Sequence, residues 1–392
     1  MKTILVLNFG SSSIKVAAFC GKKRILHGLV QNTNALDKQC LDLEIDDIAI
    51  HEQLMGMPLD KVIQKLVDVL DKNNIHPDGV GHRVLHGGEN FTASCIITEE
   101  VKSAIQRHIP LAPLHNPVQL QGIEACEAVM PTTPQVAVFD TAFHQTMPPK
   151  AFMYGVPYEY YTEMGVRRYG FHGTSHRYVS KHVCEFLNID PVGKKIIVCH
   201  LGNGSSLSAV VDGKCVDTSM GLTPLEGLLM GTRCGSCDPA VVQFIANNKN
   251  MNTDQVLNLM NKQSGLLGIA GEGTSDMRDI DRLADEGHER AGLARDMLHY
   301  QIKKLIGSYI AAMNGVDVIV FTAGIGENDP ELREAVMEQF GWLGIEIDKE
   351  KNNCKSKEIV ISTPESKVTV CVIPTNEELM ISIDTAELLN NN

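Results

Sequence analysis

The feature that most constrains the fold of this chain is a local design that occurs twice. The stretch ILVLNFGSSSIKVAAF, residues 4–19, joins two apolar runs through a turn of Asn, Gly and Ser. The stretch IIVCHLGNGSSLSAVVDGK, residues 196–214, has the same order. Apolar, β-branched runs of this length around a Gly/Ser turn predict buried hairpins. The repeat predicts two related halves, each opening with a loop of phosphate size. The alternative is that a common hairpin recurs by chance, with a solvated turn at its tip.

The rest of the chain alternates strand-like runs with amphipathic segments, which is typical of an α/β protein. Residues 58–74 carry apolar side chains at helical spacing and predict a helix that stops at Asn73 and Asn74. A long helix is expected over 290–313, and Asp329-Pro330 opens another, because proline suits the first helical position. At 392 residues, the chain predicts two domains.

Composition excludes several classes of protein. A formal charge of −13 argues against a nucleic-acid partner, which would draw on clustered Lys and Arg. The sequence has no apolar run of about 18 residues and no export signal at its start, so we expect a cytoplasmic protein that neither spans nor binds a membrane. The 11 cysteines lie mostly in apolar contexts and are expected to be reduced.

Cys234 and Cys237 form a CGSC motif that stands apart from the other cysteines. No second Cys pair or nearby His pair completes a zinc set, which argues against a metal site there. A redox-sensitive pair is the remaining alternative to two ordinary thiols.

Short signatures of common nucleotide enzymes are absent. The sequence has no GxxxxGK[ST], no GxGxxG and no HExxH, which argues against P-loop NTPases, dinucleotide oxidoreductases and zinc proteases. Polar residues gather instead in loops that mostly follow apolar strands, where α/β proteins place ligand sites. These loops are GHRVLHGGE (81–89), LAPLHNP (111–117), VFDTAFHQTMP (138–148), YGFHGTSH (169–176), DTSMGLTPLEGLLMGTRCGSCDP (217–239), TAGIGEN (322–328) and IPTNEE (373–378).

Taken together, these motifs resemble the acetate kinase family of short-chain acyl kinases, from NFGSSSIK near the start to IPTNEELM near the end. The resemblance implies a two-domain actin-like ATPase fold, a duplicated ribonuclease H-like α/β design with a central interdomain cleft that closes on its substrates. It implies a first domain over 1–148, completed by a C-terminal helix at about 384–392, and a nucleotide-binding domain over 149–383.

The implied reaction is reversible, magnesium-dependent transfer of the γ-phosphoryl group of ATP to acetate, giving acetyl phosphate and ADP. Mn²⁺ is a possible substitute for Mg²⁺, and a homodimer is the implied assembly. A propionate kinase with acetate as a secondary substrate is the alternative. An ATP-gated binding or filament protein would lack an acyl-site arginine, and a sugar kinase would require a base for its alcohol substrate.

The resemblance also implies roles for individual residues. Arg83 would bind the substrate carboxylate, because a guanidinium fork matches its oxygens. The implied catalytic residues are Asp140, Arg233 and His172, and the implied metal ligands are Asn8 and Glu377, with Asp140 contributing directly or through water. The implied nucleotide-binding residues are Ser11, Ser13, Lys15, His200, Asn203, Gly204, Asp276, Met277, Arg278, Gly324, Ile325 and Asn328.

An apolar acyl pocket is implied for Leu85, Leu114, Phe171 and Pro224, with His115 nearby. Leu85 departs from the Val common in acetate kinases, which predicts a tighter pocket that favours acetate. Two further departures concern loops. Phe9 replaces a small residue and is expected to crowd the first phosphate loop, and CGSCDP lacks a carboxylate that the family carries beside Arg233.

Overall fold

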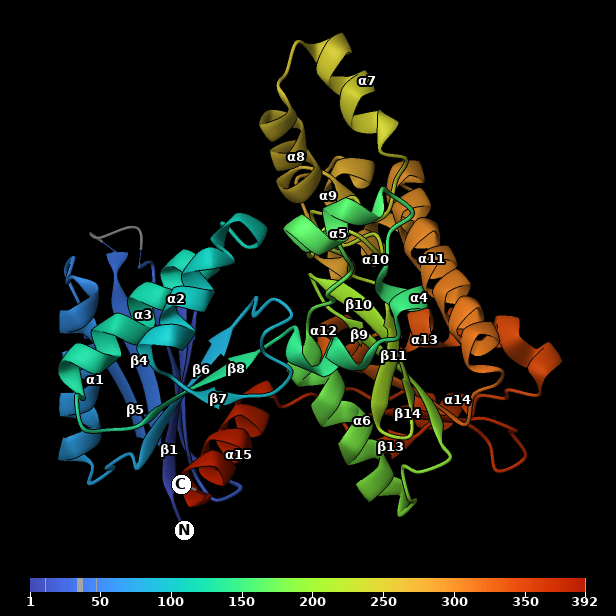
Figure 1. Ribbon diagram of the computed structural model, residues 1–392. Coiled ribbons are helices and arrows are strands. Elements are labelled where there is room, and N and C mark those ends of the chain that lie inside the picture. Colours follow the sequence, from blue (N-terminus) through green and yellow to red (C-terminus); the bar gives the residue numbers. More distant parts are fainter. Residues whose placement is uncertain (11, 34–37, 47, 392) are drawn as a thin grey trace. The chain divides into compact units, whose positions relative to one another are not determined.

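The computed structural model describes residues 1–10, 12–33, 38–46 and 48–391 (Figure 1). It divides into two compact units, the first comprising Met1–Gln145 with Asn376–Asn392 and the second Thr146–Thr375. The sequence instead predicts that the chain passes from the first domain to the second at residues 148/149 and returns at about residues 383/384. The last helix, α15 (Glu377–Asn390), begins earlier than that second boundary, and Asn376 caps it by accepting a hydrogen bond from the amide of Leu379. The predicted α/β class and the two-unit organisation are confirmed.

The first unit is built on a sheet of eight strands in the order β5-β4-β3-β2-β1-β6-β8-β7. The chain forms β1 and β2 as an antiparallel hairpin, and β6 and β8 continue the sheet parallel to β1. The strands are β1 (Thr3–Phe9), β2 (Ser13–Cys20), β3 (Lys23–Gln31), β4 (Cys40–Ile45), β5 (Ile48–Gln53), β6 (Gly79–Val84), β7 (Cys95–Ile96) and β8 (Gln135–Phe139).

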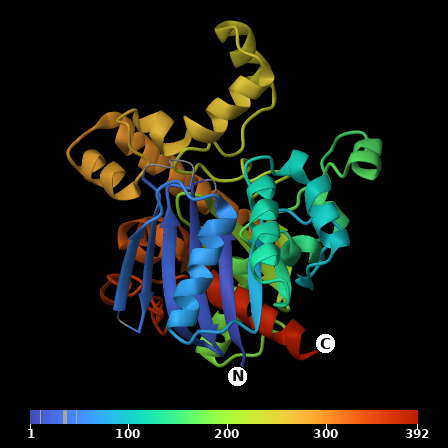
Figure 2. The same ribbon diagram turned by 90° about the vertical axis from the view of Figure 1, so that its left-hand side faces the viewer.

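Helices cover both faces of this sheet. On one face lie α1 (Leu59–Lys72) and α3 (Asn116–Val129), and on the other lies α15 (Figure 2). A Cβ on Gly81 of β6 would meet Thr385 Oγ1 at 2.5 Å, so glycine is what allows α15 to approach. The remaining helical segments are α2 (Glu99–Arg107), η2 (Ile109–Leu111) and η3 (Ala142–Thr146).

The second unit repeats this topology. Its six strands have the order β11-β10-β9-β12-β14-β13, with β9, β10 and β11 antiparallel and β12 and β14 parallel to β9. This is the arrangement of β1, β2, β3, β6 and β8 in the first unit, so the predicted repeat of the two hairpins is confirmed. The strands are β9 (Lys195–Leu201), β10 (Ser205–Val211), β11 (Lys214–Thr218), β12 (Val318–Thr322), β13 (Ile359–Val360) and β14 (Thr369–Val372).

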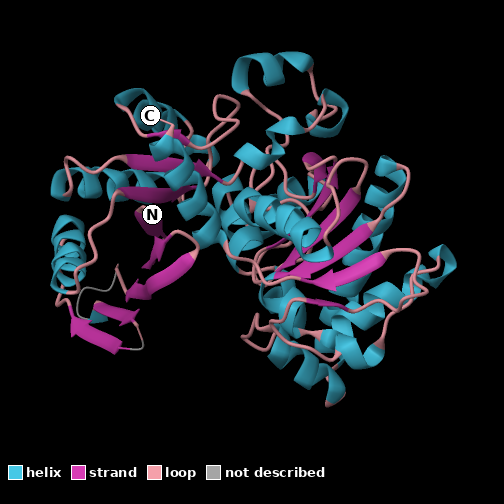
Figure 3. Cartoon of the chain, turned by 90° about the horizontal axis from the view of Figure 1, so that it is seen from below, coloured by secondary structure: helices cyan, strands magenta, loops and turns pink. Residues whose placement is uncertain are grey.

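The helices of the second unit flank its sheet (Figure 3). The long helix α11 packs its apolar side chains on the face that carries Ile197 and Ile319, and α6 lies on the other side of the strands (Figure 1). The helices are α4 (Pro149–Phe152), α5 (Tyr158–Met164), α6 (Gly173–Leu187), α7 (Ala240–Lys249), α8 (Thr253–Lys262), α9 (Gly265–Ala270), α10 (Met277–Asp285), α11 (Glu289–Met313), α12 (Ala323–Asn328), α13 (Pro330–Met337), η4 (Glu338–Leu343) and α14 (Lys349–Asn352).

The sequence predictions of helices at 58–74, at 290–313 and after Asp329 are confirmed as α1, α11 and α13. Within the described residues, no helix combines the length and apolar character needed to cross a membrane. The 11 cysteines are all free thiols, as the sequence predicts.

Candidate functional site

Three predicted site residues of the first unit come together at one edge of its sheet. Asn8 lies near the end of β1, Arg83 near the end of β6, and Asp140 directly after β8. These three strands are parallel neighbours, so their carboxyl ends meet. Residues far apart in the sequence are therefore adjacent in space.

Arg83 and Asp140 form a buried, forked ion pair. Arg83 Nε donates to the two Asp140 oxygens at 3.2 and 3.0 Å, and Arg83 Nη2 donates to Asp140 Oδ2 at 2.5 Å. Arg83 Nη1 points toward Asn8 Oδ1 at 3.5 Å. Burial alone would lower the pKa of Arg83, but the charges of Asp140 and Glu377 outweigh it and raise that pKa. Arg83 is therefore a permanent cation with fixed orientation.

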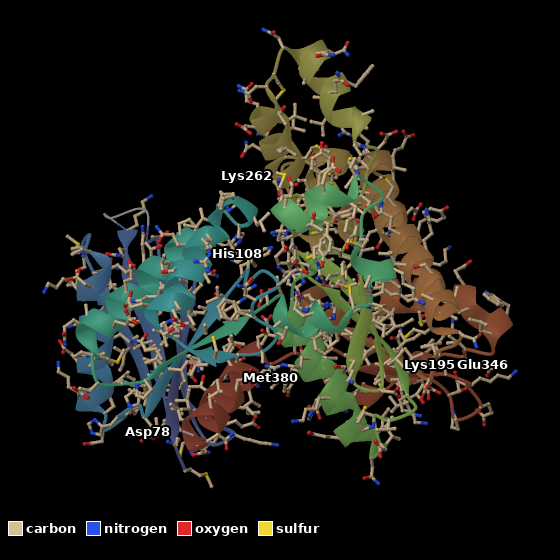
Figure 4. All side chains as sticks on the ribbon, viewed as in Figure 1. Asp78, His108, Lys195, Lys262, Glu346 and Met380 are labelled. Carbon is tan, nitrogen blue, oxygen red and sulfur yellow. The ribbon has the colours of Figure 1, made fainter. Side chains whose placement is uncertain are left out.

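Glu377 supplies a second carboxylate to this cluster from the first turn of α15, one turn before Met380, which is labelled in Figure 4. Within the described residues, its buried Oε1 has no hydrogen-bond partner. Burial raises the pKa of Glu377 to about 7, with Asp140 adding to the shift and Arg83 opposing it. An unpartnered carboxylate oxygen beside such charges has the chemistry of a ligand for a cation.

The donor set of the first unit fits magnesium. No group of three or more His, Cys, Asp and Glu side chains stands ready to hold a metal in the part of the chain that the structure describes. Mg²⁺ does not need one, because it takes one or two carboxylates with waters and phosphate oxygens. Asn8 Oδ1 and the unpartnered oxygen of Glu377 are donors of this kind.

The first hairpin brings a positive charge to the same edge. Lys15 is exposed and pairs directly across β1 and β2 with Asn8. Ser13 begins β2, and its carbonyl accepts a hydrogen bond from the Gly10 amide at 2.8 Å, which closes the turn. Ser11, also predicted to bind phosphate, lies outside the described residues.

The prediction that Phe9 crowds this loop is wrong. Its side chain is 1% exposed and packs against Gly122 of α3, where a Cβ would meet the ring at 2.4 Å. Residues alternate between the two faces of a strand, so Phe9 points into the core while Asn8 points to the opposite face.

The second unit brings His172 and His200 together. Their rings stack with centroids 4.2 Å apart. His200 lies near the end of β9, and its Nδ1 is 2.7 Å from the hydroxyl of Ser175, which also contacts the hydroxyl of Thr375 at 2.7 Å. His172 precedes α6 with a left-handed backbone, φ 57°, which is uncommon for a residue with a side chain and is found at functional sites.

Arg233 and His172 border the same glycine of the second hairpin. A Cβ on Gly204 would lie 3.3 Å from Arg233 Nη1 and 3.5 Å from His172 Nε2. Arg233 Nη1 also donates to the carbonyl of Pro224 at 3.3 Å. A Cβ on Gly231 would stand 1.8 Å from Asn203 Oδ1. The turn of the second hairpin, which carries Asn203, is therefore in close contact with the loop that carries Arg233.

Other predicted nucleotide residues lie at helix N-termini. Asp276 caps α10, and Arg278 donates to both Asp276 oxygens, at 2.9 and 2.5 Å. That hydrogen bonding lowers the pKa of Asp276. Met277 is buried in the core. Gly324, Ile325 and Asn328 belong to the short helix α12, whose left-handed residue is Ala323, with φ 64°.

The four residues predicted to form an acyl pocket are divided between the units. Leu85 is buried and its amide donates to Gln119 Oε1 at 2.9 Å, whereas Leu114 is 51% exposed and precedes His115, the N-cap residue of α3. Phe171 is 1% exposed and Pro224 is half-buried, and both belong to the second unit.

The CGSC loop forms hydrogen bonds of its own, although it lacks the carboxylate that the resemblance places beside Arg233. The Ser236 hydroxyl accepts from the Gly227 amide at 3.1 Å, and the Cys234 amide donates to Met260 at 3.0 Å. Cys234 is half-buried and Cys237 exposed. Burial, then the neighbouring Cys237, raises the pKa of the Cys234 thiol to about 11.

Sequence reasoning missed a polar network beside His172. It consists of His176, Ser206 and Ser208, all fully buried. Two spacings could have found it. His176 follows His172 by four residues, one helical turn, and Ser206 and Ser208 alternate along one face of β10.

A family model for the acetokinase family matches residues 3–383. The chain is 50% identical to the acetate kinase of Desulfitobacterium hafniense over 399 aligned residues, covering 98% of this chain and 99% of that protein. The chain belongs to the acetokinase family. The crystal structure of Porphyromonas gingivalis acetate kinase superposes with a TM-score of 0.92 at 44% identity, covering 99% of this chain and 100% of that one.

Another acetokinase-like structure is a propionate kinase from Francisella tularensis, with a TM-score of 0.93, 42% identity, and coverage of 99% of this chain and 100% of that one. The curated relatives at about 50% identity are named acetate kinases. The chain is therefore an acetokinase-family enzyme, a kinase.

Proposed function

We propose that this chain transfers the γ-phosphoryl group of ATP to acetate, reversibly and with Mg²⁺, giving acetyl phosphate and ADP. An acetate oxygen forms a bond to the γ-phosphorus as the bond from that phosphorus to the bridging oxygen of ADP breaks. Acetate is already ionised at pH 7, so the reaction needs no general base. What it needs is positive charge and alignment.

The observation that carries this proposal is the pairing of Asp140 with Arg83. A kinase that acts on an alcohol requires a base for the hydroxyl proton. Here both Asp140 oxygens accept hydrogen bonds from Arg83, so Asp140 serves to orient the guanidinium. The Nη1 edge of Arg83 makes only a long contact to Asn8, which suits it to bind the oxygens of a carboxylate substrate.

Each remaining catalytic group has a role that its surroundings support. Arg233 and His172 border Gly204 together, so both are proposed to donate hydrogen bonds to the phosphoryl group in transfer. Asn8 and Glu377 are proposed to hold Mg²⁺, or Mn²⁺ in its place, with Asp140 contributing through water. When bound, the cation neutralises charge on the polyphosphate.

The nucleotide and acyl assignments rest on family membership, residue by residue. We propose that the nucleotide binds Ser11, Ser13, Lys15, His200, Asn203, Gly204, Asp276, Met277, Arg278, Gly324, Ile325 and Asn328, and that Leu85, Leu114, Phe171 and Pro224 contact the acyl group. A homodimer in the cytoplasm is proposed on the same basis, and the free cysteines fit a reducing compartment.

A hydroxamate assay tests this function. Purified protein is incubated with ATP, Mg²⁺, acetate and hydroxylamine, which traps acyl phosphate as the hydroxamate. We expect acetohydroxamate to form in step with ADP, and to be lost in Arg83→Ala, which excludes a contaminating kinase. ADP release without hydroxamate, or phosphorylation of a sugar in place of acetate, would show that the proposal is wrong.

A further inference from the structure

His172 is connected through its Nδ1 to a chain of hydrogen bonds among buried side chains of the second unit. Its Nδ1 lies 2.9 Å from the hydroxyl of Ser206. The same hydroxyl lies 2.8 Å from Nε2 of His176. Nδ1 of His176 lies 2.8 Å from the hydroxyl of Ser208. The chain therefore runs Ser208, His176, Ser206, His172.

Secondary structure explains why these four side chains meet. Ser206 and Ser208 stand two residues apart on β10 and so point to one face of the sheet. His172 and His176 are separated by one turn at the start of α6, which packs on the sheet. Ser206, Ser208 and His176 are 0% exposed, so water does not compete for the hydrogen bonds among these three side chains.

The proton order along this chain has two possible directions. A neutral imidazole has one N–H and one acceptor nitrogen, and a hydroxyl has one hydrogen. Either every hydrogen points toward His172, or every hydrogen points toward Ser208. In the first case His172 Nδ1 accepts and its proton is on Nε2. In the second, His172 Nδ1 carries the proton and Nε2 is an acceptor.

The buried end of the chain decides between the two directions. Among the described residues, the only hydrogen-bond partner of the Ser208 hydroxyl is His176 Nδ1. If the hydrogens pointed toward Ser208, its own hydroxyl hydrogen would be buried without an acceptor. A buried donor that has no acceptor costs folding free energy, whereas an unused lone pair on a hydroxyl oxygen is tolerated. The direction toward His172 is therefore favoured.

We propose that Ser208, His176 and Ser206 form a positioning relay that holds His172 in the tautomer with its proton on Nε2. This nitrogen borders Gly204 together with the guanidinium of Arg233. An N–H there can donate to the oxygens of a phosphoryl group, whereas a bare nitrogen would repel them. The inference rests on the proposed phosphoryl transfer for its purpose, and on hydrogen-bond geometry alone for its direction.

His200 provides an internal comparison. Its ring stacks on His172, but its Nδ1 contacts Ser175 and, through it, Thr375. The relay therefore predicts that Ser206→Ala changes the tautomer of His172 and leaves that of His200 in place. Ser180→Ala is the matched control, because Ser180 is buried on α6 and its hydroxyl bonds to the Arg177 carbonyl.

The test is ¹⁵N NMR of the full-length, ligand-free protein labelled at histidine, with His172 assigned through His172→Asn. We expect Nε2 of His172 to be protonated in the wild type and in Ser180→Ala. In Ser206→Ala and Ser208→Ala we expect a mixture of tautomers. A proton on Nδ1 in the wild type, or an unchanged tautomer in Ser206→Ala, would overturn the relay. The wild-type measurement decides even if a variant fails to fold.

Kinetics separate the relay from a merely structural role. Ser206→Ala is expected to lower kcat about ten- to a hundredfold with little change in KM for ATP or acetate, because only the transition-state contact is weakened. Ser206→Thr keeps the hydroxyl and should restore most of kcat. A loss shared equally by Ser206→Thr, or one confined to KM, counts against the relay. If acetyl phosphate is never formed but the wild-type tautomer is as expected, the proposed function fails and the relay stands.

Discussion

At the scale of the residue, Gly204 is where the two groups assigned to the phosphoryl meet. Its backbone does not require glycine, since it is not among the residues with positive φ, but an added Cβ would stand 3.3 Å from Arg233 Nη1. We expect Gly204→Ala to fold normally and to lower kcat at least tenfold, because either Arg233 or the phosphoryl oxygens must shift. Steady-state kinetics and a thermal melt check this. The control is Gly292→Ala, where the space is open; equal activity in both variants would contradict the expectation.

Leu85 carries the prediction of acyl preference. The side chain is buried and larger than the valine common in the family, so the wild type should have a higher kcat/KM for acetate than for propionate. In Leu85→Val we expect the propionate-to-acetate ratio of kcat/KM to rise by about tenfold or more, since one methylene contributes about 1–3 kcal/mol. Leu120→Val, a partly buried change on α3, is the control. A wild type that prefers propionate would show that the assigned pocket is wrong.

At the scale of the element, a carboxyl group on α10, that of Asp281, predicts a pH-dependent stability. Burial raises the pKa of Asp281 to about 7, Asp329 adds to it, and Arg295 opposes it. An unfolded Asp has a pKa of about 3.9, so between these values the folded state binds the additional proton and stability falls as pH rises. We expect Asp281→Asn to raise Tm by about 2–4 °C at pH 8 and by less at pH 5. The exposed Asp296→Asn is the control; a gain that is equal at both pH values would contradict this.

The CGSC loop carries a redox prediction. With a small disulfide as oxidant, one thiolate of the pair forms a mixed disulfide and releases a thiol, and the second thiolate then displaces the other thiol. The raised pKa of Cys234 makes its thiolate scarce at pH 7, so we expect slow inactivation that speeds up as pH rises toward 9 and is reversed by dithiothreitol. Activity is followed over time in the wild type, Cys234→Ser and Cys237→Ser. Indifference of the wild type, or equal sensitivity of Cys234→Ser, would show that the pair has no such role.

At the scale of the whole molecule, the sequence predicted those features that depend on residues close together in the chain. The two hairpins, helices α1, α11 and α13, and the positions of polar residues at strand ends follow from runs of residues that are close in sequence. Partnerships across the fold did not follow. That Asp140 holds Arg83, that Phe9 faces α3, and that Ser208 orients His176 depend on which strands are neighbours, and the single sequence does not show that order. The sequence predicted the start of α15 too late, at about residue 384. The helix begins at Glu377, directly after its cap residue Asn376. The stretch IPTNEE was interpreted only as a loop that carries carboxylates.

The chain returns to its first unit with α15, which follows the whole of the second unit in the sequence. Without α15, one face of the first sheet, with Ile4, Val6 and Phe19, would lose its cover, and burial of such side chains contributes about 1.5–3 kcal/mol each. The second unit is continuous, from Thr146 to Thr375, so this deletion removes no residue of it.

We therefore expect a chain of residues 1–375 to lose hydrogen-exchange protection in peptides of the first unit and to keep it in those of the second. A chain that lacks only residues 391–392 is the control, since α15 ends at Asn390. Gly81→Ala in the full chain should reproduce the effect in part, because its Cβ would meet Ile381 and Thr385 and push α15 away. If the first unit of the truncated chain kept its protection, the expectation would be wrong. Helix α15 would then hold Glu377 in place without contributing to the stability of the sheet that it covers.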